Sequence, residues 1–175
     1  MRLDFNVLWV DDQPDRVAAQ GTNIKMQMAT EGFEFKPHYC TTIDQMSEAI
    51  SEHVFTDEID LILVDWDLGN DEHGEDAIEL IRRIVHYKDV VFYSGQATVV
   101  QLREKVYKKQ LEGVYCAGRA DLIDEVIGVF ESLIKKVLDL DHTRGIVMGA
   151  TSDIDHMVNT CLALAHGKLN DAGKA

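Results

Sequence analysis

Acidic residues follow two apolar segments of the chain, where their side chains could bind a metal ion. Asp11 and Asp12 come directly after the segment Asn6–Val10, and Asp65 comes directly after the apolar run Ile59–Val64. Several carboxylates held together cannot all stay ionised at low cost without a cation, and Mg²⁺ is a divalent ion that prefers such oxygen ligands. Beside a bound cation, Asp65 can act as a nucleophile toward a phosphoryl donor.

Two more polar residues follow the later apolar segments. Ser94 comes directly after residues 90–93, and Arg119 comes shortly after residues 113–117. A guanidinium can pair with a phosphoryl oxygen through two hydrogen bonds. The sequence leaves a second interpretation open for each residue: Ser94 could cap the helix that follows it, and Arg119 could be a surface cation near a helix start.

The elements that position these residues alternate between strand and helix patterns. Such alternation predicts an α/β fold, in which a parallel sheet carries helices on both faces. In sheets of this kind, functional groups collect beyond the carboxyl ends of the strands, so we expect the three acids and Ser94 to share one pocket. The predicted strands are residues 6–10, 33–40, 59–64, 90–93 and 113–117, and the predicted helices are residues 14–30, 41–50, 76–86, 98–109 and 122–140.

In order and approximate spacing, these landmarks resemble the receiver domain of two-component response regulators, over about residues 5–140. The resemblance implies a flavodoxin-like, doubly wound, five-stranded parallel sheet of strand order 2-1-3-4-5. The landmarks in chain order are the pair Asp11-Asp12, Asp65 at the end of Asp60–Asp65, Gly74 before the next helix, and Ser94 at the end of Val90–Ser94.

The resemblance also implies a role for each residue of the pocket. Asp65 would be the phosphoacceptor and Ser94 the hydroxyl that senses the phosphoryl group. Asp11, Asp12 and Asp65, together with the backbone carbonyl of Asp67, would bind Mg²⁺. The phosphoryl group would come from a histidine kinase or a phosphotransfer protein.

The fifth predicted strand departs from the family pattern, which has a lysine followed by a proline. If Arg119 replaces the lysine, Cys116 stands where the family has its switch aromatic. If Tyr115 is the switch aromatic, Gly118 stands in the lysine position. Arg119 is therefore the candidate lysine substitute and Tyr115 the candidate switch residue, although one register cannot satisfy both without an insertion.

The C-terminal part of the chain lies outside the five strand-helix pairs. We expect a receiver domain over residues 1–140 and an extension over residues 141–175. Within the extension, Thr143–Gly149 is expected to be a loop or a short extra strand, and Ser152–Ala165 one more amphipathic helix. That helix could contact a partner, form a homodimer or brace the domain.

The net charge narrows the choice of partners. The chain carries 17 basic and 31 acidic residues, a formal net charge of −14. A field of that sign repels phosphate backbones and anionic lipids, which disfavours direct binding to nucleic acid or to a membrane. We therefore expect a cytoplasmic protein that signals to an effector protein through protein contacts, and no enzyme activity beyond Mg²⁺-dependent self-phosphorylation and dephosphorylation at Asp65.

Two alternative functions compete with a phosphorylated receiver. A pseudo-receiver would keep the fold as a binding module without phosphorylation, as the missing lysine-proline pair suggests. A haloacid-dehalogenase-like phosphohydrolase is suggested by Asp65–Leu68, which imitates the nucleophile motif of that family. In that family the motif lies on the first core strand, whereas here it follows the third predicted strand, so the order of the motifs favours the receiver.

Overall fold

The computed structural model of the protein describes residues 3–51, 58–138 and 140–172. It divides into two compact units, Met1–Phe130 and Glu131–Ala175, which we describe separately. Within the described residues, none of the helices combines the length and hydrophobicity needed to span a membrane.

The first unit contains a five-stranded sheet in which all paired strands run parallel. The strand order is β2-β1-β3-β4-β5, which confirms the predicted flavodoxin-like order 2-1-3-4-5. The strands are β1 (Leu3–Val10), β2 (Phe33–Cys40), β3 (Leu61–Asp65), β4 (Val90–Ser94) and β5 (Val114–Gly118).

The central strands are apolar because they are covered on both faces. Every residue of β3 and β4 is buried, as expected for interior strands of a parallel sheet. The register pairs Val10 with Val64 and Ser94 with Gly118. The polar residues that end or follow these strands therefore lie at one edge of the sheet.

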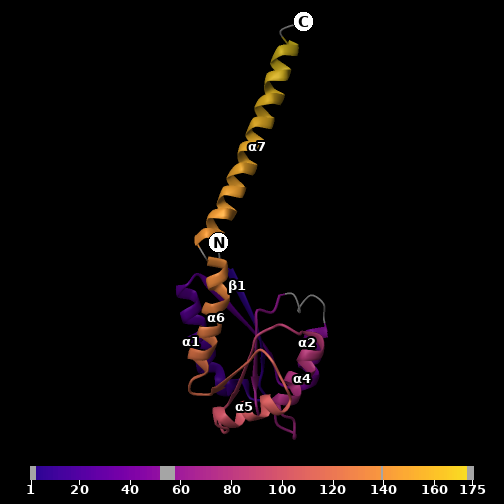
Figure 1. Ribbon diagram of the computed structural model, residues 1–175, viewed down its shortest axis with the longest axis vertical. Helices are drawn as coiled ribbons and strands as arrows, with labels where there is room; N and C mark the ends of the chain where they lie inside the picture. The colour runs from indigo at the N-terminus through magenta and orange to yellow at the C-terminus, as the bar shows by residue number, and fades with distance from the viewer. Residues whose placement is uncertain (1–2, 52–57, 139, 173–175) are drawn as a thin grey trace. The chain divides into compact units, whose positions relative to one another are not determined.

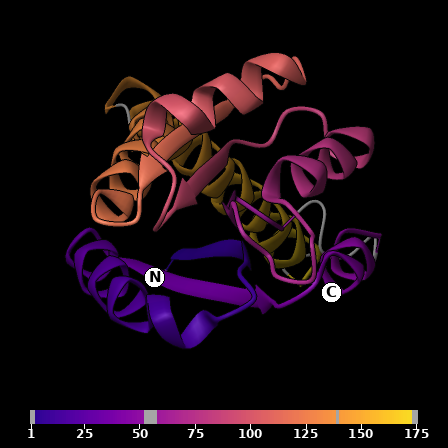
Figure 2. The same ribbon diagram turned by 90° about the horizontal axis from the view of Figure 1, so that it is seen from below.

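Helices cover the two faces of this sheet (Figures 1 and 2). The ring of Phe130 packs edge-on against Phe5 and Phe33, with centroids 5.0 Å apart in both pairs. One face carries the turn η1 (Pro14–Val17), α1 (Ala18–Thr30) and the start of α6 (Leu122–Leu138), and the other carries α2 (Ile43–Ser51), α4 (Gly74–Ile84) and α5 (Val99–Lys108).

The second unit contains the helix α7 (Leu140–Ala172), which confirms the extra C-terminal helix. The loop or short strand expected over Thr143–Gly149 is wrong, because α7 runs through these residues. Gly145 and Gly149 suggested a loop, yet a glycine weakens a helix by only about 1 kcal/mol. Apolar side chains along α7 are exposed: Ile146, Val147, Met148, Ile154, Met157, Val158, Leu162 and Leu164.

Candidate functional site

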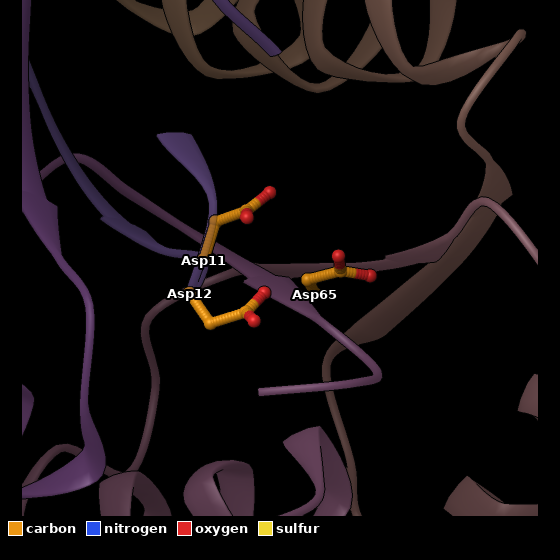
Figure 3. Close-up of side chains that lie close together, drawn as sticks. All are labelled: Asp11, Asp12 and Asp65. Carbon is orange, nitrogen blue, oxygen red and sulfur yellow. The ribbon is translucent and has the colours of Figure 1, made fainter. Parts of the chain in front are cut away.

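The predicted acidic residues meet at the carboxyl end of the sheet. Asp11 and Asp12 follow β1, Asp65 ends β3, and these two strands are neighbours. One carboxylate oxygen from each residue lies within 4.8 Å of the other two (Figure 3). Asp11 and Asp65 are buried, with 1% and 3% of their surfaces exposed, and Asp12 is partly exposed.

The three carboxylates suit a hard divalent cation. Two oxygens that both bind Mg²⁺ directly, at about 2.1 Å each, can be at most about 4.2 Å apart. Separations of up to 4.8 Å therefore fit a site in which a small side-chain shift or a water molecule completes the coordination. Mg²⁺ usually keeps several waters in proteins, which agrees with this arrangement.

Asp65 is tied to its surroundings through both carboxylate oxygens. Its Oδ1 accepts a hydrogen bond from the backbone N–H of Trp66 at 2.8 Å, and its Oδ2 pairs with Nη2 of Arg119 at 2.6 Å. Burial, followed by the nearby Asp11 carboxylate, raises the pKa of Asp65 to about 7, although Arg119 acts in the opposite direction. Without a metal, ionisation of Asp65 is therefore costly, and a bound cation would favour it.

Asp11 is also held through both of its oxygens. Oδ1 accepts the backbone N–H of Gln13 at 2.8 Å, and Oδ2 accepts the hydroxyl of Tyr93. The indole Nε1–H of Trp9 donates to the same Tyr93 hydroxyl at 2.8 Å. Burial and the neighbouring carboxylates raise the pKa of Tyr93 well above its ordinary value, so its phenol stays protonated and remains a donor.

Tyr93 is a residue of the site that the sequence analysis missed. Its aromatic side chain on an apolar strand is typical of a core residue, and the side chain is indeed fully buried. The signal that could have identified it is the pairing of β3 with β4, because two residues that pair across parallel strands point to the same face of the sheet. Tyr93 is that partner, directly before Ser94.

Asp12 lies beside the loop that follows β3. The side-chain amide of Gln13 donates to its Oδ2 at 2.8 Å. Gly69 has a φ of +73°, and a Cβ there would lie 3.2 Å from the same oxygen. A glycine allows the loop to adopt this left-handed conformation close to the Asp12 carboxylate. It also leaves the carboxylate uncovered by a side chain at position 69.

Ser94 lines a pocket with Asp12 and Asp65, whereas the buried Asp11, which we expected in the same pocket, is not among the described residues that line it. Its Oγ accepts the backbone N–H groups of Gln96 and Ala97, both at 3.0 Å, while the N-cap of α5 is Thr98 in a capping box. The hydroxyl hydrogen of Ser94 is the donor that these two bonds leave available. The pocket has a volume of about 220 Å³ and is lined by Asp12, Gln13, Arg16, Asp65, Asp67, Ser94, Gly95, Gln96 and Arg119.

The structure brings the candidate cation Arg119 to the predicted phosphoacceptor. The backbone N–H of Arg119 donates to the carbonyl of Ser94 at 2.8 Å, which anchors the residue just beyond β5. A Cβ on Gly95 would lie only 3.2–3.3 Å from the guanidinium, so glycine leaves space for it. The Nε–H of Arg119 is buried and has no hydrogen-bond partner in the described structure.

Of the two remaining predicted site residues, Asp67 lies in the pocket and Tyr115 lies outside its lining. Asp67 lines the pocket, and its Oδ1 accepts the backbone N–H of Gly69 at 3.2 Å. Tyr115 lies on β5 level with Val91, is 41% exposed, and is not among the described residues that line the pocket.

A close backbone contact places α4 against the end of β3. A Cβ on Gly74 would lie 2.2 Å from the carbonyl oxygen of Asp65 and 2.7 Å from the ring of Phe92. Only glycine fits such a contact without displacing the backbone. The contact explains why residue 74 is a glycine; α4 begins at this residue, two residues before the predicted start at Asp76.

Comparison with solved structures identifies the fold. A response regulator receiver domain protein (CheY-like) from Methanospirillum hungatei JF-1 is 14% identical over 75% of this chain and 98% of its own, with a TM-score of 0.54. The non-phosphorylated HemR receiver domain from Leptospira biflexa is 18% identical over 74% and 94%, with a TM-score of 0.52.

A third similar structure is a response regulator protein from Burkholderia pseudomallei with a phosphorylated aspartic acid, a calcium ion and citrate. It is 15% identical over 78% of this chain and 75% of its own, with a TM-score of 0.52. The amino-acid sequence matches no protein-family model and no curated protein. The chain therefore has the fold of response regulator receiver domains.

Proposed function

We propose that this chain is a phosphorylatable receiver of two-component signalling and that Asp65 accepts the phosphoryl group. The observation that carries the proposal is the surroundings of Asp65, which lies beside Asp11 and Asp12 and also pairs with Arg119. The receiver module would span residues 1–140, with residues 141–175 as its extension.

The proposed reaction is a transfer to the carboxylate. An oxygen of Asp65 attacks the phosphorus atom of the donor, the bond between phosphorus and the donor breaks, and the leaving group departs with the electron pair. When bound to the three carboxylates and the carbonyl of Asp67, Mg²⁺ would neutralise charge on the transferred oxygens. A histidine kinase or a phosphotransfer protein would supply the phosphoryl group.

Ser94 and Arg119 would respond to the new charge of a phosphoryl group on Asp65. The hydroxyl of Ser94 can donate to a phosphoryl oxygen. The guanidinium of Arg119 can leave the Asp65 carboxylate and pair with the phosphoryl group instead. Its Nε–H, which has no partner in the described structure, is an additional donor for that group. Because the backbone of Arg119 is bonded to Ser94, their movement would be transmitted along β5 to Tyr115, the proposed switch residue.

The proposed output is contact with an effector protein in the cytoplasm. The net charge of −14 disfavours direct binding to nucleic acid and to anionic membranes. The exposed apolar side chains of α7 are candidates for contact with the effector or with a second copy of the chain in a homodimer.

One experiment separates the three candidate functions. The protein is incubated with Mg²⁺ and a small phosphoryl donor such as phosphoramidate, and both protein-bound phosphate and released phosphate are followed over time. A lasting acyl phosphate supports the receiver, turnover of the donor without a lasting acyl phosphate supports the phosphohydrolase, and the absence of both supports the pseudo-receiver.

A further inference from the structure

The hydroxyl of Tyr93 is the centre of a buried chain of hydrogen bonds. It accepts from Trp9 Nε1–H at 2.8 Å and donates to Oδ2 of Asp11. Trp9 and Tyr93 are both 0% exposed and Asp11 is 1% exposed. Trp9 lies on β1 and Asp11 directly follows that strand, whereas Tyr93 lies on β4. Because β3 separates β1 from β4 in the sheet, these hydrogen bonds cross the strand that carries Asp65.

Packing fixes the two aromatic members of this chain. The indole of Trp9 stacks on Tyr39, with ring centroids 5.3 Å apart, and meets the ring of Tyr93 edge-on at 6.5 Å. The oxygen of the Tyr93 hydroxyl accepts the hydrogen bond from the Trp9 indole N–H. Its own hydrogen is therefore directed at Asp11. The orientation of the Asp11 carboxylate is therefore set before any cation arrives.

We propose that Tyr93, held by Trp9, is a positioning residue for Mg²⁺ binding, which acts by orienting the carboxylate of Asp11 in the metal-free protein. This inference rests on the proposed function, since it concerns the same metal site. Outer partners that orient a metal ligand typically contribute about 10- to 100-fold to metal affinity. The Gln13 N–H holds only Oδ1 of Asp11, so loss of the Tyr93 hydroxyl would leave Oδ2 without its donor.

The test uses the full chain and a Mg²⁺ titration followed by ¹H–¹⁵N NMR. Tyr93→Phe removes only the hydroxyl, and Tyr107→Phe makes the same change at a tyrosine that is 83% exposed on α5. We expect Tyr93→Phe to weaken Mg²⁺ binding about tenfold and Tyr107→Phe to leave it unchanged. At saturating Mg²⁺ the phosphorylation rate of Tyr93→Phe should approach that of the wild type, because only the metal dependence is affected.

Trp9→Phe provides a second variant, since it keeps the Tyr93 hydroxyl and removes the donor that directs it. We expect a smaller loss of Mg²⁺ affinity, and a double variant that binds no more weakly than Tyr93→Phe alone, because Trp9 acts through Tyr93. In the metal-free wild type, the Trp9 indole N–H should exchange slowly with solvent, and this protection should fall in Tyr93→Phe but not in Tyr107→Phe.

The outcomes distinguish failure of the proposed function from failure of the positioning role. A wild type that binds no Mg²⁺ overturns the proposed function and this inference with it. A wild type that binds Mg²⁺, with equal or tighter binding by Tyr93→Phe, overturns only the inference. If Tyr93→Phe does not fold, Trp9→Phe decides in its place, and wild-type Mg²⁺ affinity in that variant contradicts the positioning role.

Discussion

The guanidinium of Arg119 pairs with the carboxylate of Asp65, with Nη2 2.6 Å from Oδ2. This contact supports Arg119, rather than Gly118, as the candidate for the lysine position of the family pattern. Gly118 is level with Ser94 and has no side chain to offer, whereas Arg119, one residue further, reaches the pocket. A cation therefore lies where a phosphoryl group on Asp65 would need one.

Replacement of Arg119 should separate metal binding from the response to phosphorylation. In Arg119→Ala we expect Mg²⁺ affinity to stay unchanged or rise slightly, because a competing positive charge is lost. NMR shifts of Ser94 and Tyr115 on phosphorylation should become smaller. Arg119→Lys keeps the charge and should retain part of the response. Wild-type behaviour of Arg119→Ala in both measurements would mean that the ion pair has no role in the switch.

The raised pKa of Asp65 predicts that the stability of the metal-free protein depends on pH. In the folded protein the Asp65 carboxyl group keeps its proton up to about pH 7, whereas the ordinary pKa of an aspartate is 3.8. Between these values the folded state binds more protons than the unfolded state, so the free energy of unfolding should fall as pH rises from about 4 to about 7. A pKa that rises from 3.8 to about 7 corresponds to about 4 kcal/mol in full, so the part contributed by Asp65 between about pH 4 and about pH 7 should be about 3 kcal/mol.

The measurement is urea denaturation in the presence of a chelator at about pH 5 and about pH 8. Other groups also titrate over this range, so the wild type is compared with Asp65→Asn, which lacks the titrating carboxyl group. The variant should be the more stable of the two at the higher pH only. Equal pH dependence in both proteins would contradict the raised pKa.

Mg²⁺ should stabilise the wild type in proportion to its binding. At a Mg²⁺ concentration of about 100 times Kd, the free energy of unfolding should rise by about 2.7 kcal/mol. Asp12→Asn should lose most of this gain because it removes one of the three carboxylates. Asp15→Asn, at an exposed position on η1, removes the same charge outside the pocket and should keep the gain. Thermal unfolding with and without Mg²⁺ measures the stabilisation of each variant by the ion. If both variants lost the same share of this stabilisation, the effect of Asp12→Asn would be a nonspecific effect of charge.

The close approach of α4 to β3 predicts a cost for any side chain at position 74. Gly74→Ala should lower the free energy of unfolding by about 2–3 kcal/mol, because its Cβ would collide with the Asp65 carbonyl. Gly128→Ala is the matched control, since a Cβ there meets no atom within 4 Å. That variant should gain up to about 1 kcal/mol from helix propensity. Equal stability of the two variants would show that the backbone contact can relax.

The sequence predicted the sheet and its acidic edge well, because both follow from simple patterns. Apolar runs such as Ile59–Val64 are typical of buried parallel strands, and the residues that follow such strands must meet at one edge. The continuous α7 was harder to predict, since its glycines resemble loop signals. The role of Tyr93 depends on a hydrogen bond across β3, which no local pattern reveals. The choice between Gly118 and Arg119 depended on a register that differs by one residue.

The most direct test of the account is phosphorylation of Asp65 itself. The full chain is incubated with Mg²⁺ and phosphoramidate, and the site of any added phosphoryl group is located by mass spectrometry of the intact protein and its peptides. Asp65→Asn is compared with Asp71→Asn, a matched change at an exposed residue of the following loop. The account predicts one phosphoryl group on Asp65 in the wild type and in Asp71→Asn, and none in the folded Asp65→Asn protein. Labelling of Asp65→Asn at the wild-type rate, or no labelling of the wild type in saturating Mg²⁺, would contradict it.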